Sequence, residues 1–322
     1  MMTRTENTER EYRLKLKTIY VRYFQREDND GSLNSREKVL SVFSKIESAL
    51  TTNSAKKYRA VLRWHCRNES IKLEKNDMKI TLSNSKSLKM KTYPKDLRLR
   101  VLKLINSVAR PRESVKRFVE LHLKVGVLVG YRLNELRDIS VEVIRSDKFG
   151  GEDRCKVIIV NGKATNGRSN GDTRWIELPE KFDGFSVSES ISELKELYLS
   201  SPKMLGAARS LHMKVVNVAL KRRSETSLRP TLSSTRHEFK VSVVEACGGI
   251  LCSAAMGHIS SDTQKRHYGK RNLNSSKIDK DLVKFHKEMV VSPENIERVR
   301  VIEREKIWDK IVTGEQRKFQ KI

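Results

Sequence analysis

The chain has 322 residues and carries 66 Lys and Arg against 40 Asp and Glu, a formal net charge of +26. A basic excess of this size indicates a polyanionic partner and favours nucleic acid over an anionic membrane face or a merely soluble basic surface. Hydrophobic residues make up 37% of the chain, and no run of about 18 apolar residues occurs, which excludes a membrane-spanning protein.

The length exceeds what one hydrophobic core usually serves, so we expect two domains. The charged N-terminal segment lacks the apolar core of a signal peptide, and we expect a cytoplasmic, nucleoid-associated protein. The four cysteines show no Cys-x-x-Cys spacing, so the sequence supports neither a zinc site nor a disulfide framework. We expect no metal and no cofactor.

Residues 1–80 are predicted to form a helical domain, because apolar residues recur three and four positions apart. The polar faces between them are rich in Lys and Arg, most clearly in the segment Lys56–Glu69. We expect a small basic bundle that grips a DNA backbone. Its candidate DNA contacts are Lys56, Lys57, Arg59 and Arg63. Trp64, in contrast, is expected to pack in the core.

Residues 81–95 are polar and basic and are interpreted as a linker, followed by a second domain over 96–271 and a charged helical tail over 272–322. The second domain starts with helical patterning that includes one long run over 112–139. Three strand-like runs follow, separated by Gly, Asn and Asp, over 141–146, 156–163 and 173–179. The predicted fold is mainly α (α+β), with a small three-stranded antiparallel sheet in the second domain.

Arg236, His258 and Tyr268 lie within one short stretch of this basic chain and carry the chemistry of phosphoryl transfer. An arginine offers a planar fork of donors to a phosphate, and a histidine exchanges protons near neutral pH. A tyrosine hydroxyl can attack phosphorus, although its usual pKa of about 10 requires help in removing the proton. Further upstream, Arg132 stands in GYRLNELRDI and Lys163 in VNGKATNGRSNGDTRWIELP.

The order of these motifs, ending in TRHEF, MGH and HYG, resembles the catalytic domain of the tyrosine recombinases, the phage-integrase family, over residues 95–270. The N-terminal helical region resembles that family's core-binding domain in position and character. The resemblance implies a double-stranded DNA substrate, four protomers on two DNA sites, and no metal or cofactor. It assigns catalytic roles to Arg132, Lys163, Arg236, His258 and Tyr268.

In those implied roles, a helix presents Arg132, and Arg132 and Arg236 clamp the scissile phosphate. Lys163 protonates the leaving 5′-oxygen, His258 assists at the phosphate, and Tyr268 is the nucleophile that forms a 3′-phosphotyrosine. Glu135 is expected to support Arg132 through a salt bridge. In the family the lysine at the position of Lys163 lies on a hairpin, which here corresponds to the runs 156–163 and 173–179 and the segment between them. That hairpin also holds Arg168 and Arg174, which leaves the choice of general acid open. Arg168 and His267 are further candidate DNA contacts.

Two features depart from the family pattern. Ser233 occupies the position three residues before Arg236, where a His or Lys is usual, and His237 cannot replace it because neighbours on a helix point about 100° apart. The interval from His258 to Tyr268 is also one residue longer than is usual.

The leading function is a site-specific DNA recombinase or integrase that serves a mobile element. A hairpin telomere resolvase, a type IB topoisomerase-like enzyme and an inactive DNA-binding protein of the same fold are the alternatives.

Overall fold

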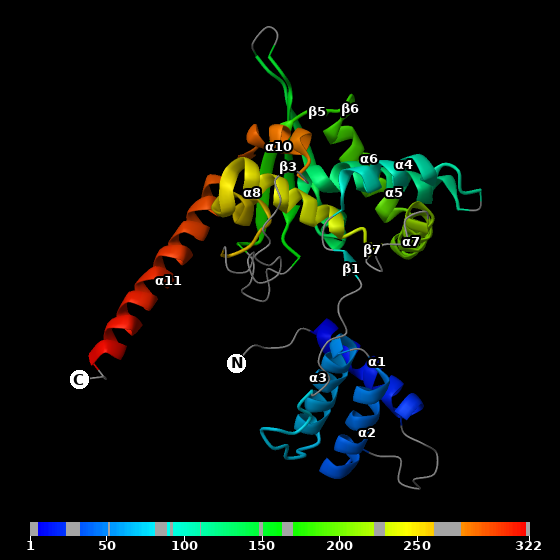
Figure 1. The fold of residues 1–322 in the computed structure, drawn as a ribbon, viewed down its shortest axis with the longest axis vertical. Helices are drawn as coiled ribbons and strands as arrows, with labels where there is room; N and C mark the ends of the chain where they lie inside the picture. The colour runs from blue at the N-terminus through cyan, green and yellow to red at the C-terminus, as the bar shows by residue number, and fades with distance from the viewer. Residues whose placement is uncertain are drawn as a thin grey trace. The chain divides into compact units, whose positions relative to one another are not determined.

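The computed structural model describes residues 6–23, 33–50, 52–80, 89–90, 93–109, 111–147, 151–162, 170–221, 229–260 and 278–319. Its contacts divide the chain into two compact units, 1–87 and 88–322 (Figure 1). Among the described residues, none of the helices combines the length and the apolar character that crossing a bilayer requires.

The first unit is built from three helices, α1 (Glu6–Tyr23), α2 (Arg36–Ala49) and α3 (Thr52–Asn68), as the apolar spacing predicts. Ser35 caps α2, since its hydroxyl accepts the Lys38 backbone N–H at 3.3 Å. The core of this unit includes Ile19, Val39, Phe43, Ile46 and Leu62. Trp64 is 7% exposed and meets the Tyr12 ring edge-on at 5.9 Å, which confirms the expected packing role.

The second unit is mainly helical. Its helices are α4 (Lys95–Ile105), α5 (Glu113–Val129), α6 (Val187–Leu199), α7 (Met204–Lys221), α8 (Ser234–Ala255), α10 (Lys280–Lys287) and α11 (Pro293–Phe319), with a 3-10 helix η1 (Leu133–Asp138) after α5. α5 contacts α4, α6, α7, α8 and α10, and it is buried on most sides because its sequence is apolar almost throughout (Figure 1). The helical run predicted over 112–139 is too long, because α5 ends at Val129 and a separate 3-10 helix, η1, follows.

The sheet of the second unit has four antiparallel strands in the order β2 (Ser140–Ile144), β3 (Arg154–Val160), β4 (Thr173–Pro179) and β8 (Val290–Val291). The first three are those predicted. The structure adds a fourth strand, β8, to these three, because Val291, in the tail that was expected to be helical, pairs with Ile176. β3 and β4 form a hairpin whose last paired residues are Val160 and Thr173.

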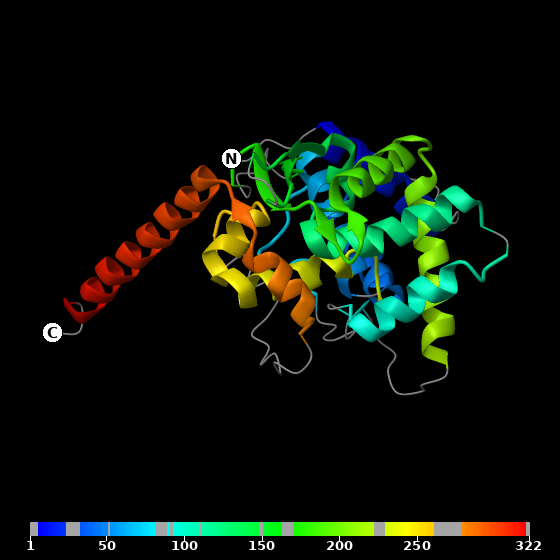
Figure 2. The same ribbon diagram turned by 90° about the horizontal axis from the view of Figure 1, so that it is seen from above.

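Two short pairings complete the second unit: β1 (Lys89–Met90) runs parallel to β7 (Arg229–Pro230), and β5 (Lys181–Phe182) pairs with β6 (Phe185–Ser186). β1 lies within the stretch interpreted as a linker. Helix α8 is interrupted at Gly248, where φ is +84° and ψ 173°. Helix α11 starts at Pro293, contacts α8, and then extends outward from the rest of this unit (Figures 1 and 2).

Candidate active site

A glycine turn places Arg132. Gly130 follows α5 with φ +65°, and its N–H donates to the Gly126 carbonyl at 3.2 Å. A Cβ on Gly130 would lie 2.0 Å from the Phe239 ring, so both the left-handed backbone and the close contact require glycine. Arg132 then lies in extended backbone, φ −86° and ψ 147°, immediately before η1. The expectation that a helix presents Arg132 is therefore wrong, because the glycine ends α5 before the arginine.

Glu135 is the anion around which the arginines gather, and its side chain is 0% exposed. It accepts from the Arg132 backbone N–H at 2.7 Å and from Arg132 Nη1 at 2.5 Å, which confirms the expected salt bridge. Burial alone would raise the pKa of this carboxyl. Nearby Arg174, Arg236 and Arg132 outweigh burial and hold the pKa well below its usual range, so Glu135 is ionised near neutral pH.

Arg236, on the first turn of α8, joins two turns that are far apart in sequence. Its Nη1 donates to the Gly130 carbonyl, and its Nη2 donates to the Met256 carbonyl at 2.7 Å. Nη2 also lies 3.5 Å from His258 Nε2, and Nη1 lies 3.8 Å from a Glu135 oxygen. Arg132, Arg236 and His258 are therefore gathered in one site, as the motif order predicts.

The Met-Gly-His motif forms the turn that ends α8. Gly257 has φ +65°, and a Cβ there would lie 2.3 Å from Asn161 Oδ1 and 3.1 Å from Arg174 Nη1. The His258 backbone N–H then donates to the Ser253 carbonyl at 2.8 Å. The glycine is needed because it lets the chain pass closely over the β3–β4 hairpin and return His258, 4% exposed, to Arg236.

Arg174 lies beneath this site with a side chain that is 0% exposed. Its Nη2 donates to Glu135 Oε2 at 2.8 Å, its Nε donates to the Ala255 carbonyl at 2.9 Å, and its Nη1 donates to Asn161. The sequence suggests Arg174 as an alternative general acid, and the burial of its side chain removes that role. The sequence feature that indicates this burial is the alternation of β4, which turns Arg174, Ile176 and Leu178 inward.

Lys163, Arg168, His267 and Tyr268 lie outside the described residues. The described residues that precede these two segments, Gly162 and His258, lie at the candidate site. The Gly162 backbone N–H donates to Glu135 Oε1 at 3.3 Å, immediately before Lys163. On the other side, His258–Ser260 precede the 261–277 segment that contains Tyr268.

Ser233, where the family usually has a base, is exposed at the start of α8 and makes no side-chain capping hydrogen bond. His258, whose Nε2 lies 3.5 Å from Arg236 Nη2, offers an imidazole at this site. Among the described residues, no group of three or more His, Cys, Asp or Glu side chains is arranged to hold a metal ion.

The basic residues predicted on α3 have two different environments. Lys56 and Lys57 are exposed. Arg59 and Arg63 are half-buried and donate to the backbone carbonyls of Met78 and Asp77, at 3.5 and 3.2 Å. These two arginines therefore hold the turn after α3 within the first unit.

The sequence matches no family model and no curated protein. Among solved structures, the chain is similar to lambda integrase residues 75–356, a dimer bound to a COC′ core site, with 17% identity over 86% of this chain and 93% of that chain and a TM-score of 0.54. A lambda integrase dimer on the same kind of site gives 16% identity over 86% and 75%, with a TM-score of 0.53. XerH site-specific recombinase bound to difH substrate gives 18% over 84% and 78%, with a TM-score of 0.47. The likeness to lambda integrase shows that this chain has the tyrosine recombinase fold, as the sequence resemblance predicts.

Proposed function

We propose that this protein is a site-specific DNA recombinase that cuts and rejoins DNA strands through a 3′-phosphotyrosine on Tyr268, for the integration or excision of a mobile element. The observation that carries the proposal is that Arg132 and Arg236 lie against the buried carboxylate of Glu135, with His258 beside Arg236. Three arginines against one carboxylate make the site positive, which suits a phosphodiester.

The proposed reaction needs no external energy. The Tyr268 hydroxyl oxygen attacks phosphorus, the bond from phosphorus to the 5′-oxygen breaks, and Lys163 gives a proton to that oxygen. Arg132 and Arg236 stabilise the charge that develops on the non-bridging oxygens. Because the phosphodiester energy stays in the tyrosyl ester, the reverse attack by a 5′-hydroxyl reseals the strand.

His258 is the proposed route for the Tyr268 proton, because Ser233 supplies no base at its position. His258 Nε2 lies 3.5 Å from Arg236 Nη2, so a phosphate held by Arg236 is also within reach of the imidazole. In its neutral form, an imidazole can accept that proton.

The partners follow from the charge and the fold. A net charge of +26 supports binding to double-stranded DNA, and the similar integrase and recombinase structures are themselves complexes with DNA sites. Exposed Lys56 and Lys57 are proposed backbone contacts of the first unit, a core-binding domain. We place the protein on DNA in the cytoplasm as a tetramer, and the exposed apolar side chains of Val301, Ile307 and Trp308 on α11 support contact between protomers.

A suicide substrate tests the reaction. Nicked duplexes that tile the DNA flanking the gene are incubated with the protein in EDTA, and a covalent protein–DNA band is expected on those that carry its site. Tyr268→Phe should abolish the band, and Ser233→Ala should retain it. Absence of a band with the unaltered protein on every duplex would refute the recombinase and favour the inactive DNA-binding alternative. Rejoining to a second duplex, rather than to the same strand, separates a recombinase from a topoisomerase-like enzyme.

A further inference from the structure

Two asparagines, Asn161 and Asn170, lie at the base of the β3–β4 hairpin, on either side of the connection that contains Lys163. The Asn161 backbone N–H donates to the Asp172 carbonyl at 2.7 Å, and Asn161 Nδ2 donates to the Gly171 carbonyl at 2.9 Å. On the other side of the hairpin base, just before β4, the Asn170 backbone N–H donates to the Gly257 carbonyl at 3.3 Å. The base of the hairpin is therefore tied to the turn that carries His258.

Helix α11 holds the same base from the other side. Asn170 Nδ2 donates to the Asn295 carbonyl at 2.5 Å, and Asn295 Nδ2 donates back to the Asn170 carbonyl at 3.0 Å and lies 3.3 Å from the Thr173 carbonyl. Both side chains are buried, with exposures of 1% and 3%. This exchange joins two segments that lie 125 positions apart in the sequence.

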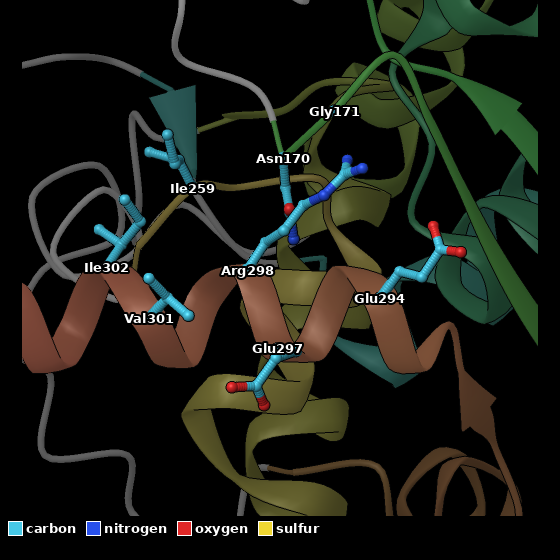
Figure 3. A pocket seen from close by; sticks show the side chains of 8 residues that line it. All are labelled: Asn170, Gly171, Ile259, Glu294, Glu297, Arg298, Val301 and Ile302. Carbon is cyan, nitrogen blue, oxygen red and sulfur yellow. The ribbon is translucent and has the colours of Figure 1, made fainter.

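Arg298, one turn further along α11, covers the next residue of the hairpin. Its side chain rises from the helix toward Asn170 and Gly171, as Figure 3 shows. A Cβ on Gly171 would lie 1.9 Å from Arg298 Nη1, and Gly171 itself has φ +77°. The hairpin and the first turns of α11 are therefore in close contact, and not merely adjacent.

The start of α11 is itself fixed to the sheet. β8 pairs with β4, and the Ser292 backbone N–H donates to the Trp175 carbonyl at 3.2 Å. The Ser292 hydroxyl then accepts the Asn295 N–H at 3.4 Å. Asn295 consequently belongs to a rigid frame, and such frames hold a functional side chain better than a loop does.

We propose that Asn295 is a positioning residue for the proton transfer by Lys163: it fixes the hairpin base so that the lysine in the loop reaches the leaving 5′-oxygen. This inference rests on the proposed function. It predicts that a change on α11, away from the arginines and the tyrosine, impairs one step of the reaction selectively. The Asn295 side chain donates to the carbonyls of Asn170 and Thr173, and not to Arg132, Arg236 or His258.

The test compares two DNA substrates in single-turnover cleavage, a normal phosphodiester and a 5′-bridging phosphorothiolate, whose thiolate leaves without a proton. Asn295→Ala should slow cleavage of the normal substrate by roughly 10- to 100-fold, the usual effect of losing a supporting contact. It should cleave the phosphorothiolate within roughly threefold of the unaltered rate, as Lys163→Ala should, because no acid is needed. Glu294→Ala, an exposed neighbour on the same turn, is the control and should behave like the unaltered protein on both substrates.

Amide hydrogen exchange provides a readout that does not depend on activity. In Asn295→Ala the amides of Asn161 and Asn170, both hydrogen-bonded at the hairpin base, should exchange at least about tenfold faster, while those of α5 stay unchanged. Unchanged exchange at Asn161 and Asn170 would overturn the positioning role, whatever the enzyme does. An equal loss on both DNA substrates would overturn the link to the proton transfer. If the unaltered protein cuts neither substrate, the proposed function fails, and the exchange result still decides whether Asn295 holds the hairpin.

Discussion

The ion pair between Glu135 and Arg174 should be a principal support of the candidate site, and a double-mutant cycle can measure it. Both side chains are 0% exposed, and Arg174 Nη2 lies 2.8 Å from Glu135 Oε2. At an effective dielectric of about 20, two unit charges at this distance attract by about 6 kcal/mol. Removal of one partner from a buried pair costs about 3–5 kcal/mol, because the other charge stays buried.

Arg174→Met should therefore lower the free energy of unfolding of the second unit by about 4 kcal/mol, since Glu135 keeps Arg132 but loses its buried partner. Glu135→Gln should cost a similar amount, because three guanidinium groups then repel each other without an anion. The double variant should lose about 2–3 kcal/mol less than the sum of the two, which is the coupling of a contacting pair.

Tryptophan fluorescence can follow the second unit during guanidinium unfolding. The chain has three tryptophans, and in a Trp64→Phe, Trp308→Phe background the remaining Trp175 lies next to Arg174 on β4. A coupling below about 0.5 kcal/mol, the lower limit for interacting residues, would refute the view that this pair supports the site.

Three further changes test the surroundings of the site. Gly130→Ala should destabilise the protein by at least about 2 kcal/mol, because φ is +65° and the new Cβ would meet the Phe239 ring. Gly206→Ala on α7 is the control, and it should stabilise the protein by about 0.5 kcal/mol because open space surrounds this glycine. Thermal melts compare the two variants. Burial raises the pKa of Glu238 from 4.5 to about 7, so the free energy of unfolding falls as the pH rises from 4.5 to 7. Glu238→Gln should remove this pH dependence and raise the free energy of unfolding by about 3 kcal/mol at pH 8. Burial lowers the pKa of His122 to about 4 from 6.5, so its contribution is complete above pH 6.5 and is lost as pH falls toward 4; denaturant midpoints from pH 4 to 8 should show a shallower acid slope in His122→Gln.

The sequence predicts the parts of this fold that depend on local patterning. Period-3.6 spacing identifies α1 to α3, and alternation identifies β2 to β4, because one face of each element must be buried. The order of the motifs was sufficient to predict that Arg132, Arg236 and His258 belong together.

Three features do not follow from local pattern alone. β8 has only two residues, Val290–Val291, and its pairing depends on where α10 places the chain against β4. The alternation of β4 turns Arg174 inward, but a buried arginine is exceptional, and its burial is explained only by its carboxylate partner, Glu135, which comes from another part of the chain. The asparagine exchange between α11 and the hairpin has no sequence signature, since its members are 125 positions apart.

Mapping the covalent adduct tests the central claim most directly. Trypsin cuts after Arg266 and Lys270, so Tyr268 lies in the four-residue peptide HYGK. After trapping on a nicked duplex in EDTA and digestion with nuclease and trypsin, mass spectrometry should find a nucleotide remnant on Tyr268 of this peptide. It should be absent from Tyr268→Phe and strongly reduced in Arg236→Ala. A remnant on another residue, or an adduct that persists in Tyr268→Phe, would contradict the assignment of Tyr268 as nucleophile.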